Sequence, residues 1–235
     1  DHPGEFTDKK IQIPINKLNM RPAFRRLERV SMEEIKQVVK EREVPFLVHF
    51  TQLVNLPSIL ENGLLCRDAI PENVAVNDEM RLDGRRNTIS LSIAFPNHRM
   101  FYKYRQANQV PWCVLALKPS VLWDLECMFC KHNAADARIS GISDADLSSV
   151  AALREMFDEI PPLDSREEQR LKIFDPTDPQ AEVLVNESIP ADYIGGVVFP
   201  DRPSKDQYQH LSERLKLVEH SRNEGFFASR GYVRR

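Results

Sequence analysis

One carboxylate stands out for the chemistry it could do, because Glu182 begins an otherwise apolar run that continues from Val183 to Val185. The run is short and β-branched, and Pro179 precedes it, so it predicts a strand that both faces of a sheet could bury. A carboxylate at the start of such a strand is costly to desolvate unless hydrogen-bond donors or a positive charge meet it. Glu182 is therefore either a structural acid or a catalytic acid, and the strand alone leaves both interpretations open.

A histidine and two serines could serve the same site. The segment 44–50 is rich in β-branched and aromatic residues and predicts a strand with His49 near its end. Residues 88–93 alternate between polar and apolar types, which predicts a strand with its aliphatic side chains facing the core. Ser90 and Ser92 would then look out from the opposite face. The structural alternative for His49 is a core histidine whose ring is satisfied by the backbone.

Three arginines lie at the end of a polar, unperiodic segment over residues 67–87, namely Arg81, Arg85 and Arg86. A loop of this length in a compact domain is usually functional, and an arginine can hold a phosphate through two parallel hydrogen bonds. The alternative is a solvated loop. Taken one by one, the histidine, the arginines and the acid do not establish a functional site. Their order along the chain is the stronger evidence for one.

Other familiar chemistries lack their motifs. Cys127 and Cys130, followed by His132, resemble half of a zinc site, but neither Cys66 nor Cys113 belongs to a second C-x-x-C pair. Free thiols, buried or half-exposed, are the preferred interpretation. The sequence has no P-loop motif, no G-x-G-x-x-G and no H-E-x-x-H, which excludes P-loop nucleotide binding, a Rossmann site and a zincin. A serine triad would have no nucleophile-elbow motif to anchor it.

Short strands with interposed helices must position these side chains. The predicted strands cover residues 44–50, 88–93, 112–117, 183–185 and 193–199, and the glycines of the last one suggest a bulge or a close backbone approach. The predicted helices cover residues 31–41, 55–62, 97–105, 144–157 and 203–222, the first of them begun by Ser31. We expect a loosely packed arm over residues 9–30 and an insertion-like stretch over residues 128–179. The pattern predicts an α+β fold.

Length and composition bound the class of protein. The chain has 235 residues, of which 42% are hydrophobic, enough for the core of one large domain. No apolar segment approaches the roughly 18 residues of a membrane helix, so we expect no membrane contact. Four cysteines are too few for a disulfide framework, which favours a cytoplasmic location. Residues 1–6 lack an initiator Met and resemble a cloning remnant, so a single domain is expected over residues 7–235.

The formal net charge of −3 gives no overall basic character, so any nucleic-acid contact must come from local patches. Three basic patches are formed by Arg25, Arg26 and Arg29, by Arg99, Lys103 and Arg105, and by Arg230, Arg234 and Arg235. Tyr102, Tyr104 or Phe227 could stack on bases beside them. Each patch by itself is more often a solvated face.

Three blocks, in this order, resemble the DarT family, the DNA ADP-ribosyltransferase toxins of bacterial toxin–antitoxin pairs. They lie in residues 48–64, in residues 81–105 and in residues 180–185. The resemblance implies an ADP-ribosyltransferase-like split antiparallel β core with flanking helices, which holds NAD in a cleft and needs no metal. It also implies a substrate loop before the catalytic glutamate, where residues 133–179 lie.

The resemblance implies that Glu182 is the catalytic glutamate. Arg81 best matches the family's catalytic arginine and would also hold NAD, with Arg85 and Arg86 as nearby alternatives. Breaking the bond between nicotinamide and ribose builds positive charge on the sugar, as in glycoside hydrolysis. A fixed carboxylate beside that charge stabilises the transition state more than the ground state.

The NAD-binding residues are also carried over by the resemblance. His49 matches the NAD-holding histidine on the first strand, and Thr51 or Asn55 match its polar companions. Ser90 and Ser92 would lie on the second motif strand, where relatives place an aromatic residue or a serine.

The resemblance implies that a base in single-stranded DNA receives ADP-ribose and that a cognate macrodomain antitoxin neutralises the enzyme. A base that acts as nucleophile must be unstacked to be reached. The sequence leaves thymine and guanine open as the acceptor. Two other functions remain open: an ADP-ribosyltransferase acting on RNA or protein, and a non-catalytic nucleic-acid-binding module.

Overall fold

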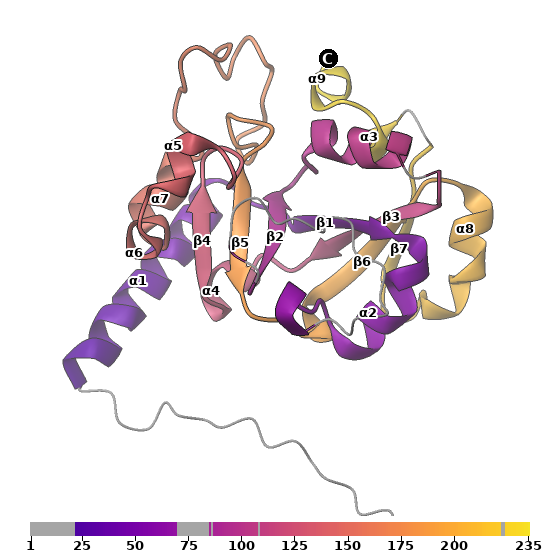
Figure 1. Ribbon diagram of the computed structural model, residues 1–235, viewed down its shortest axis with the longest axis horizontal. Helices are drawn as coiled ribbons and strands as arrows, with labels where there is room; N and C mark the ends of the chain where they lie inside the picture. The colour runs from indigo at the N-terminus through magenta and orange to yellow at the C-terminus, as the bar shows by residue number, and fades with distance from the viewer. Residues whose placement is uncertain (1–21, 70–84, 86, 108, 222–223) are drawn as a thin grey trace, which may run out of the picture.

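Seven strands form one sheet in the part of the chain that the computed structural model describes, which is residues 22–69, 85, 87–107, 109–221 and 224–235. The strand order is β4-β5-β2-β1-β3-β6-β7, and every neighbouring pair is antiparallel except β6 and β7 (Figure 1). The strands are β1 (Leu47–Gln52), β2 (Thr88–Ile93), β3 (Trp112–Leu117), β4 (Cys127–Cys130), β5 (Glu182–Asn186), β6 (Ile194–Phe199) and β7 (Lys216–Glu219). The predicted α+β class is confirmed.

The sheet opens between β1 and β2. β1 pairs with β3 along its whole length, from Leu47 to Gln52. With β2 it shares only two residue pairs, Leu47 with Ile93 and Val48 with Ser92. Beyond this junction the β4-β5-β2 half turns away from the β1-β3-β6-β7 half, as Figure 1 shows. The β core is therefore split, as predicted.

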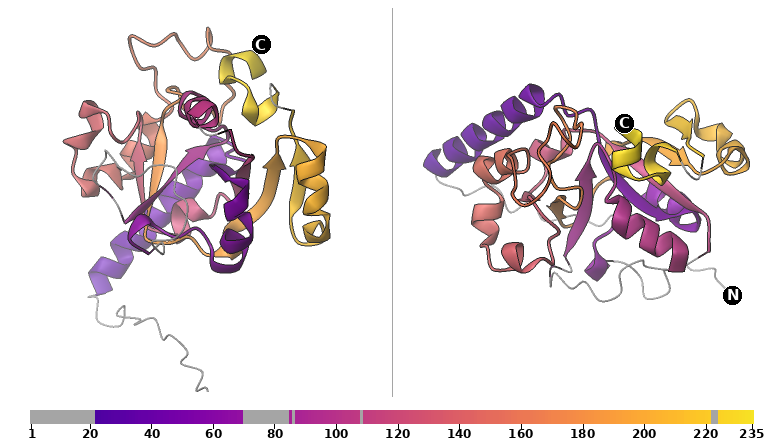
Figure 2. Two further views of the ribbon diagram at one scale, coloured as in Figure 1. Left: turned by 45° about the vertical axis from the view of Figure 1, so that its right-hand side comes forward. Right: turned by 90° about the horizontal axis from the view of Figure 1, so that it is seen from above.

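Helices lie around the two half-sheets. They are α1 (Pro22–Glu41), α2 (Leu56–Asn62), α3 (His98–Ala107), α4 (Val121–Asp124), α5 (Ala137–Ser140), α6 (Asp144–Leu147), α7 (Val150–Glu155), α8 (Arg202–Gln207) and α9 (Arg230–Val233). α1 packs against α4 and α7 at the β4 side of the molecule, and α3 and α9 remain neighbours in every view (Figures 1 and 2). Within the described ranges, none of the helices combines the length and the apolarity that crossing a bilayer requires.

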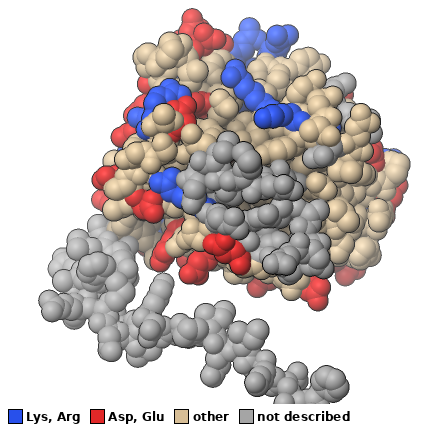
Figure 3. Space-filling view, viewed as in Figure 1, with Lys and Arg blue, Asp and Glu red and all other residues tan. Residues whose placement is uncertain are grey.

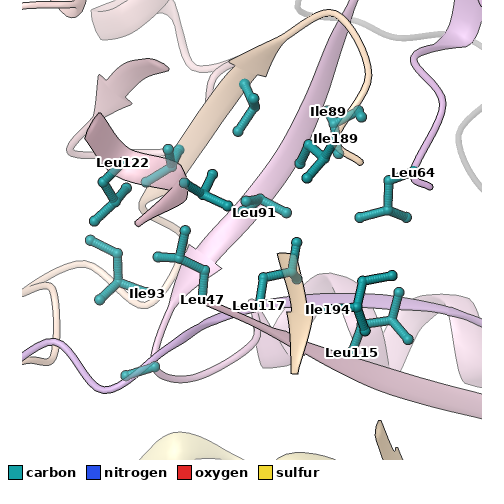
Figure 4. Packing of buried hydrophobic residues seen from close by; sticks show 14 of the residues in the cluster. Leu47, Leu64, Ile89, Leu91, Ile93, Leu115, Leu117, Leu122, Ile189 and Ile194 are labelled. Carbon is teal, nitrogen blue, oxygen red and sulfur yellow. The ribbon is translucent and has the colours of Figure 1, made fainter. Parts of the chain in front are cut away.

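Aliphatic side chains from β1, β2, β3 and β6 pack together on one side of the sheet (Figure 4). Leu47, Leu91 and Leu115 are at most 1% exposed. Val48, the next residue along β1, points to the other face and packs in a separate cluster with Phe101 of α3. Burying one leucine side chain contributes roughly 1.5–3 kcal/mol. The main core therefore fixes β1 against β2 at their short junction.

Two predicted strands have the bounds that the sequence predicts, since β2 spans residues 88–93 and β3 spans residues 112–117. The helix expected over residues 55–62 is α2, and Gly63 ends it with a φ of +82°. Glycine is favoured at this position because its backbone adopts positive φ without strain. A Cβ here would also collide with the carbonyl oxygen of Ile189. Both conformation and space therefore require glycine.

The first helix is longer than predicted. We expected it to begin at Ser31, after a loose arm over residues 9–30, but α1 begins at Pro22 and continues without a break past Ser31. Proline suits the first turn of a helix because the first backbone amides have no intrahelical partner there. The helical prediction was therefore too short at its start. Residues 1–21 lie outside the described residues.

The prediction of one helix over residues 203–222 is wrong in its second half. The segment forms α8, a turn and then β7, which pairs in parallel with β6. The edge of a sheet offers backbone groups that need partners, and this pairing overrides the helical periodicity of the side chains. Gly196 of β6 comes so close to β7 that a Cβ would meet the carbonyl oxygen of Lys216 at 2.8 Å. The predicted close approach at the glycines of β6 is thus confirmed.

The predicted helix over residues 144–157 is also interrupted. It forms α6 and α7, and the Ser149 hydroxyl begins the second by accepting a hydrogen bond from the Ala152 amide at 3.1 Å. Serine competes for backbone donors in this way and so favours a new helix start. The sequence does not predict β4, which lies at the beginning of the expected insertion.

Candidate active site

Glu182 is the first residue of β5 and is 6% exposed. Its Oε1 accepts a hydrogen bond from Nδ2 of Asn133 at 3.2 Å, and its Oε2 accepts one from the backbone amide of Ala134 at 2.8 Å. Both donors belong to the turn that follows β4, whose last residue, Cys130, pairs with Glu182. A buried carboxylate needs such donors. The end of β4 thereby holds the carboxylate in one orientation.

A buried pair that sequence reasoning missed supports this turn. Nδ1 of His132 lies 2.6 Å from Oδ2 of Asp178, and the two residues are 3% and 5% exposed. The other carboxylate oxygen of Asp178 accepts from the backbone amide of Gln180 at 2.8 Å. The pair therefore ties the turn after β4 to the segment that enters β5. The sequence showed His132 only as a possible metal ligand, and no spacing rule connects it with Asp178.

Ser90 and Ser92 lie on the same face of the sheet as Glu182. β2 and β5 pair Leu91 with Val183. Residues that face each other across an antiparallel pair point to the same side, and neighbours along a strand point to opposite sides. One residue further along both strands, Ser92 comes opposite Glu182. Leu91 and Val183 belong to the core on the other face, so the predicted division of β2 into a core face and a polar face is confirmed.

His49 bridges the opening between the two half-sheets. Its Nδ1 lies 3.0 Å from the carbonyl oxygen of Ser90. A carbonyl oxygen only accepts, so Nδ1 carries the hydrogen of this contact. Ser90 pairs with Leu184, which lies two residues from Glu182, or about 7 Å along the strand. The structure therefore connects the β1 histidine to the strand that carries the acid.

Thr51 and Asn55 form the third group of predicted site residues. Thr51 is 3% exposed and lies two residues beyond His49 on β1, so both side chains belong to the same face. Nδ2 of Asn55 donates to Oγ1 of Thr51 at 3.1 Å. Asn55 precedes α2, but its side chain makes no capping bond to that helix. The contact joins the turn that precedes α2 to β1 beside His49.

Only one of the three candidate arginines is described. Arg81, the preferred catalytic arginine, and Arg86 lie outside the described residues. Arg85 donates from Nε and Nη2 to Oδ1 of Asp144, at 3.2 and 2.9 Å. Its side chain is 15% exposed. Arg85 is thus committed to an ion pair with α6.

The position of Arg85 also separates it from the acid. Its carbonyl oxygen accepts from the amide of Thr88, which pairs with Asn186 at the far end of β5. The length of β5 places Asn186 about 13 Å from Glu182. Arg85 instead lines a cavity of about 270 Å³ with Asp144 and Asn186. The structure does not bring Arg85 to Glu182.

The predicted basic patch at the C-terminal end is largely turned inward. Arg230 is 4% exposed, and Arg234 forms a two-pronged ion pair with Asp175 at 2.7 and 2.8 Å. Phe227 is 3% exposed and packs in the aromatic cluster, so its expected stacking role is wrong. A patch of three exposed arginines is therefore not present here. The side chains of the first patch, at residues 25–29, are not among the described ones.

The outer face of α3 keeps part of the expected basic character. Arg99 and Lys103 are exposed, and Tyr102 between them is 58% exposed. Arg105 is half-buried and donates to the carbonyl oxygen of Phe227 at 2.8 Å, so it belongs to the packing below the helix. Basic side chains gather over α3 and α9 on the face shown in Figure 3. This surface remains the candidate for contact with nucleic-acid phosphates.

The cysteines are free thiols, as predicted, and of the two alternatives, buried or half-exposed, all four are buried: Cys66, Cys113, Cys127 and Cys130. Burial raises the pKa of Cys113 and of Cys127 to about 12. Thiols with such a pKa are unreactive at neutral pH. Among the described residues, no group of three or more His, Cys, Asp or Glu side chains is placed to hold a metal ion.

Comparison with known families identifies one match. The family model described as "ssDNA thymidine ADP-ribosyltransferase, DarT" matches residues 48–227. The matched range begins at the residue before His49 and includes Glu182. No curated protein matches the chain significantly.

Solved structures share the fold. The structure of Thermus sp. 2.9 DarT in complex with NAD+ is 14% identical, with a TM-score of 0.50 over 76% of this chain and 96% of that chain. The structure of Thermus sp. 2.9 DarT in complex with ADP-ribosylated ssDNA is 16% identical, with a TM-score of 0.51 over 76% of this chain and 95% of that chain. These likenesses confirm the predicted ADP-ribosyltransferase-like fold.

Proposed function

The chain belongs to the DarT family of single-stranded-DNA thymidine ADP-ribosyltransferases, and we propose that Glu182 stabilises the transition state of its reaction. The enzyme transfers ADP-ribose from NAD to a nucleobase in single-stranded DNA and releases nicotinamide. The bond from ribose C1′ to nicotinamide breaks with its electron pair on nicotinamide, the base bonds to C1′, and the base loses a proton to solvent. The sugar passes through an oxocarbenium-like state.

One observation carries this proposal. The buried carboxylate of Glu182 is held by Asn133 and by the backbone of Ala134, on the sheet face that also carries Ser92. A carboxylate already fixed where positive charge develops need not reorganise during the reaction, so it stabilises the transition state more than a mobile one. The same burial that first made a structural acid plausible also suits this role.

We propose that the NAD site lies where the two half-sheets part. His49, whose Nδ1 hydrogen is directed to the carbonyl oxygen of Ser90, would bind the ribose of NAD on the β1 side. Thr51, held by Asn55, would complete the polar lining on the β1 side, and Ser90 would line the β2 side. These residues fit a sugar-rich ligand because they offer neutral acceptors and donors beside an apolar core.

For the catalytic arginine we retain Arg81, which would grip the NAD pyrophosphate through two parallel hydrogen bonds. The family resemblance supports this assignment. The ion pair of Arg85 with Asp144, at the far end of β5 from Glu182, supports Arg81 over Arg85.

We propose thymine as the acceptor base, on the support of the family description. The test combines NAD with oligonucleotides that contain thymine or guanine as the only reactive base type, and with the matching oligoribonucleotides. The proposed enzyme adds the mass of one ADP-ribose unit to the thymine DNA and releases nicotinamide. An unchanged oligonucleotide mass indicates a binding module, and modification of RNA or of the protein alone indicates a different transferase.

The role of Glu182 is tested with Glu182→Gln, which keeps the size of the side chain and removes its charge. Removing one preorganised electrostatic group typically lowers kcat by roughly 10²–10³-fold, and we expect a loss of transfer in this range. Glu213→Gln, at an exposed position, is the matched control and should keep wild-type activity. Transfer by Glu182→Gln within a few-fold of the control would reject the assignment.

We also infer a cognate macrodomain antitoxin and a cytoplasmic location, both on the support of the family resemblance. A macrodomain that removes ADP-ribose would restore the original mass of the modified oligonucleotide. Co-expression of such a partner should rescue growth of cells that produce the active enzyme, whereas cells that produce Glu182→Gln should not need it.

A further inference from the structure

Arg230 reaches from α9 into the loop that precedes Glu182. We call residues 156–181, between α7 and β5, the pre-acid loop. Nη1 of Arg230 donates to the carbonyl oxygen of Pro176 at 2.7 Å, and Nη2 donates to that of Thr177 at 3.0 Å and to Oε1 of Gln169 at 3.1 Å. Three acceptors from one loop thus meet one buried guanidinium.

Arg234, which directly follows the last residue of α9, contacts the same loop. Its two-pronged ion pair is with Asp175, whose side chain has no exposed surface. The guanidinium also lies over the rings of Phe95 and Phe174, at 5.5 and 5.7 Å from their centres. A carboxylate so deeply buried is stable only with a partner of good geometry. Arg230 and Arg234 therefore fix the segment from Asp175 to Thr177. Figure 2 shows α9 beside the pre-acid loop.

This segment leads directly to the proposed catalytic acid. Asp178 follows Thr177 and binds His132. His132 in turn precedes Asn133 and Ala134, which hold Glu182. Hydrogen bonds and chain neighbours therefore connect α9 through the pre-acid loop to the Glu182 carboxylate.

We propose that Arg230 and Arg234 are positioning residues for the reaction, which fix the pre-acid loop and through it the Glu182 carboxylate. The proposal rests on the proposed role of Glu182. α9 lies beyond residues 48–227, the range matched by the family model, so the family match does not supply this role. The two arginines act on the protein itself and leave DNA contact to other basic side chains.

The environment of Arg230 agrees with an inward role. Burial lowers the pKa of Arg230 to about 10, which leaves the side chain cationic at neutral pH. A buried cation with three short hydrogen bonds to protein acceptors has little capacity for a DNA phosphate. Arg235, which follows Arg234, is exposed, and its side chain makes no ion pair within the described residues. It therefore provides a control of equal charge.

The test compares Arg230→Gln and Arg234→Gln with Arg235→Gln. Steady-state transfer to a thymine oligonucleotide is measured well below the Tm of every variant, together with the Kd for NAD and amide hydrogen exchange over residues 172–178. We expect kcat to fall roughly ten- to hundredfold in the first two variants, because a misplaced catalytic group loses up to about 10²-fold. The Kd for NAD should stay within about twofold, since the change affects the transition state. Exchange over residues 172–178 should accelerate.

A purely structural role of α9 predicts a different result, namely a lower Tm with kcat equal to that of Arg235→Gln. That result overturns the proposal. If Arg234→Gln does not fold, Arg234→Lys decides by the same measurements, because lysine keeps the charge but cannot form the two-pronged pair. Failure of the proposed function would show separately as transfer by Glu182→Gln, and the exchange measurement does not depend on activity.

Discussion

Removal of the Asp178 carboxylate should destabilise the protein strongly. The side chain is 5% exposed and accepts from His132 at 2.6 Å and from the Gln180 amide at 2.8 Å. Asp178→Ala leaves both donors without their acceptor. Each lost hydrogen bond to a charged group costs roughly 1.5–3 kcal/mol. We therefore expect the free energy of unfolding to fall by roughly 3–5 kcal/mol, the range for breaking a buried pair.

Urea unfolding followed by circular dichroism measures this loss. The comparison requires that the slope of the free energy of unfolding against urea concentration is the same in every variant. Asp192→Ala, at an exposed position, is the control and should change stability by no more than about 0.5 kcal/mol. Asp178→Asn should lie between the two, because its amide oxygen still accepts from one donor. A loss below about 1 kcal/mol for Asp178→Ala would refute the reasoning, since the pair would then not hold the turn after β4.

Two further predictions concern the donors of Glu182 and the pH dependence of stability. Asn133→Ala removes one hydrogen-bond donor of the Glu182 carboxylate, and a hydrogen bond to a charged group contributes roughly 1.5–3 kcal/mol. The substitution should lower kcat for transfer about tenfold or more at nearly constant Kd for NAD. An unchanged kcat would contradict this. Burial, and after it the charge of Arg230, lowers the pKa of His98 from 6.5 to about 4. Between these pH values the unfolded chain binds a proton that the folded chain does not, so stability falls as pH falls from 6.5 to 4. His98→Gln should flatten this part of a plot of Tm against pH, and an NMR titration midpoint of His98 near 6.5 would contradict the assignment.

Local patterns along the chain were sufficient for the centre of the fold. The alternation at residues 88–93 predicts both the strand β2 and the face of its serines. Gly63 predicts the end of α2 because few other residues adopt its backbone conformation. The place of Glu182 at the start of an apolar strand predicts that its carboxylate needs hydrogen-bond donors, and Asn133 and Ala134 supply them. In each case the physical cause lies within a few residues of the sequence feature.

The parts that were missed depend on partners far away in the chain. β7 forms because β6 offers an edge, which no periodicity within residues 203–222 reports. The inward direction of Arg230 depends on carbonyl groups more than 50 residues earlier, at Pro176 and Thr177. The same is true of His132 and Asp178. A basic or titratable side chain near a sequence motif therefore does not reveal whether it faces solvent or the protein.

The narrow junction between β1 and β2 has a mechanical consequence. In the described part of the chain, the strands of the two half-sheets pair with each other only at Leu47 with Ile93 and at Val48 with Ser92. Beyond these pairs, the two half-sheets are held together by the side chains of the main core and by the contact of His49 with the carbonyl oxygen of Ser90. His49 and Glu182 belong to opposite sides of this junction. A small change of angle there alters the spacing between the group proposed to hold NAD and the acid proposed to act on it, with both strands intact.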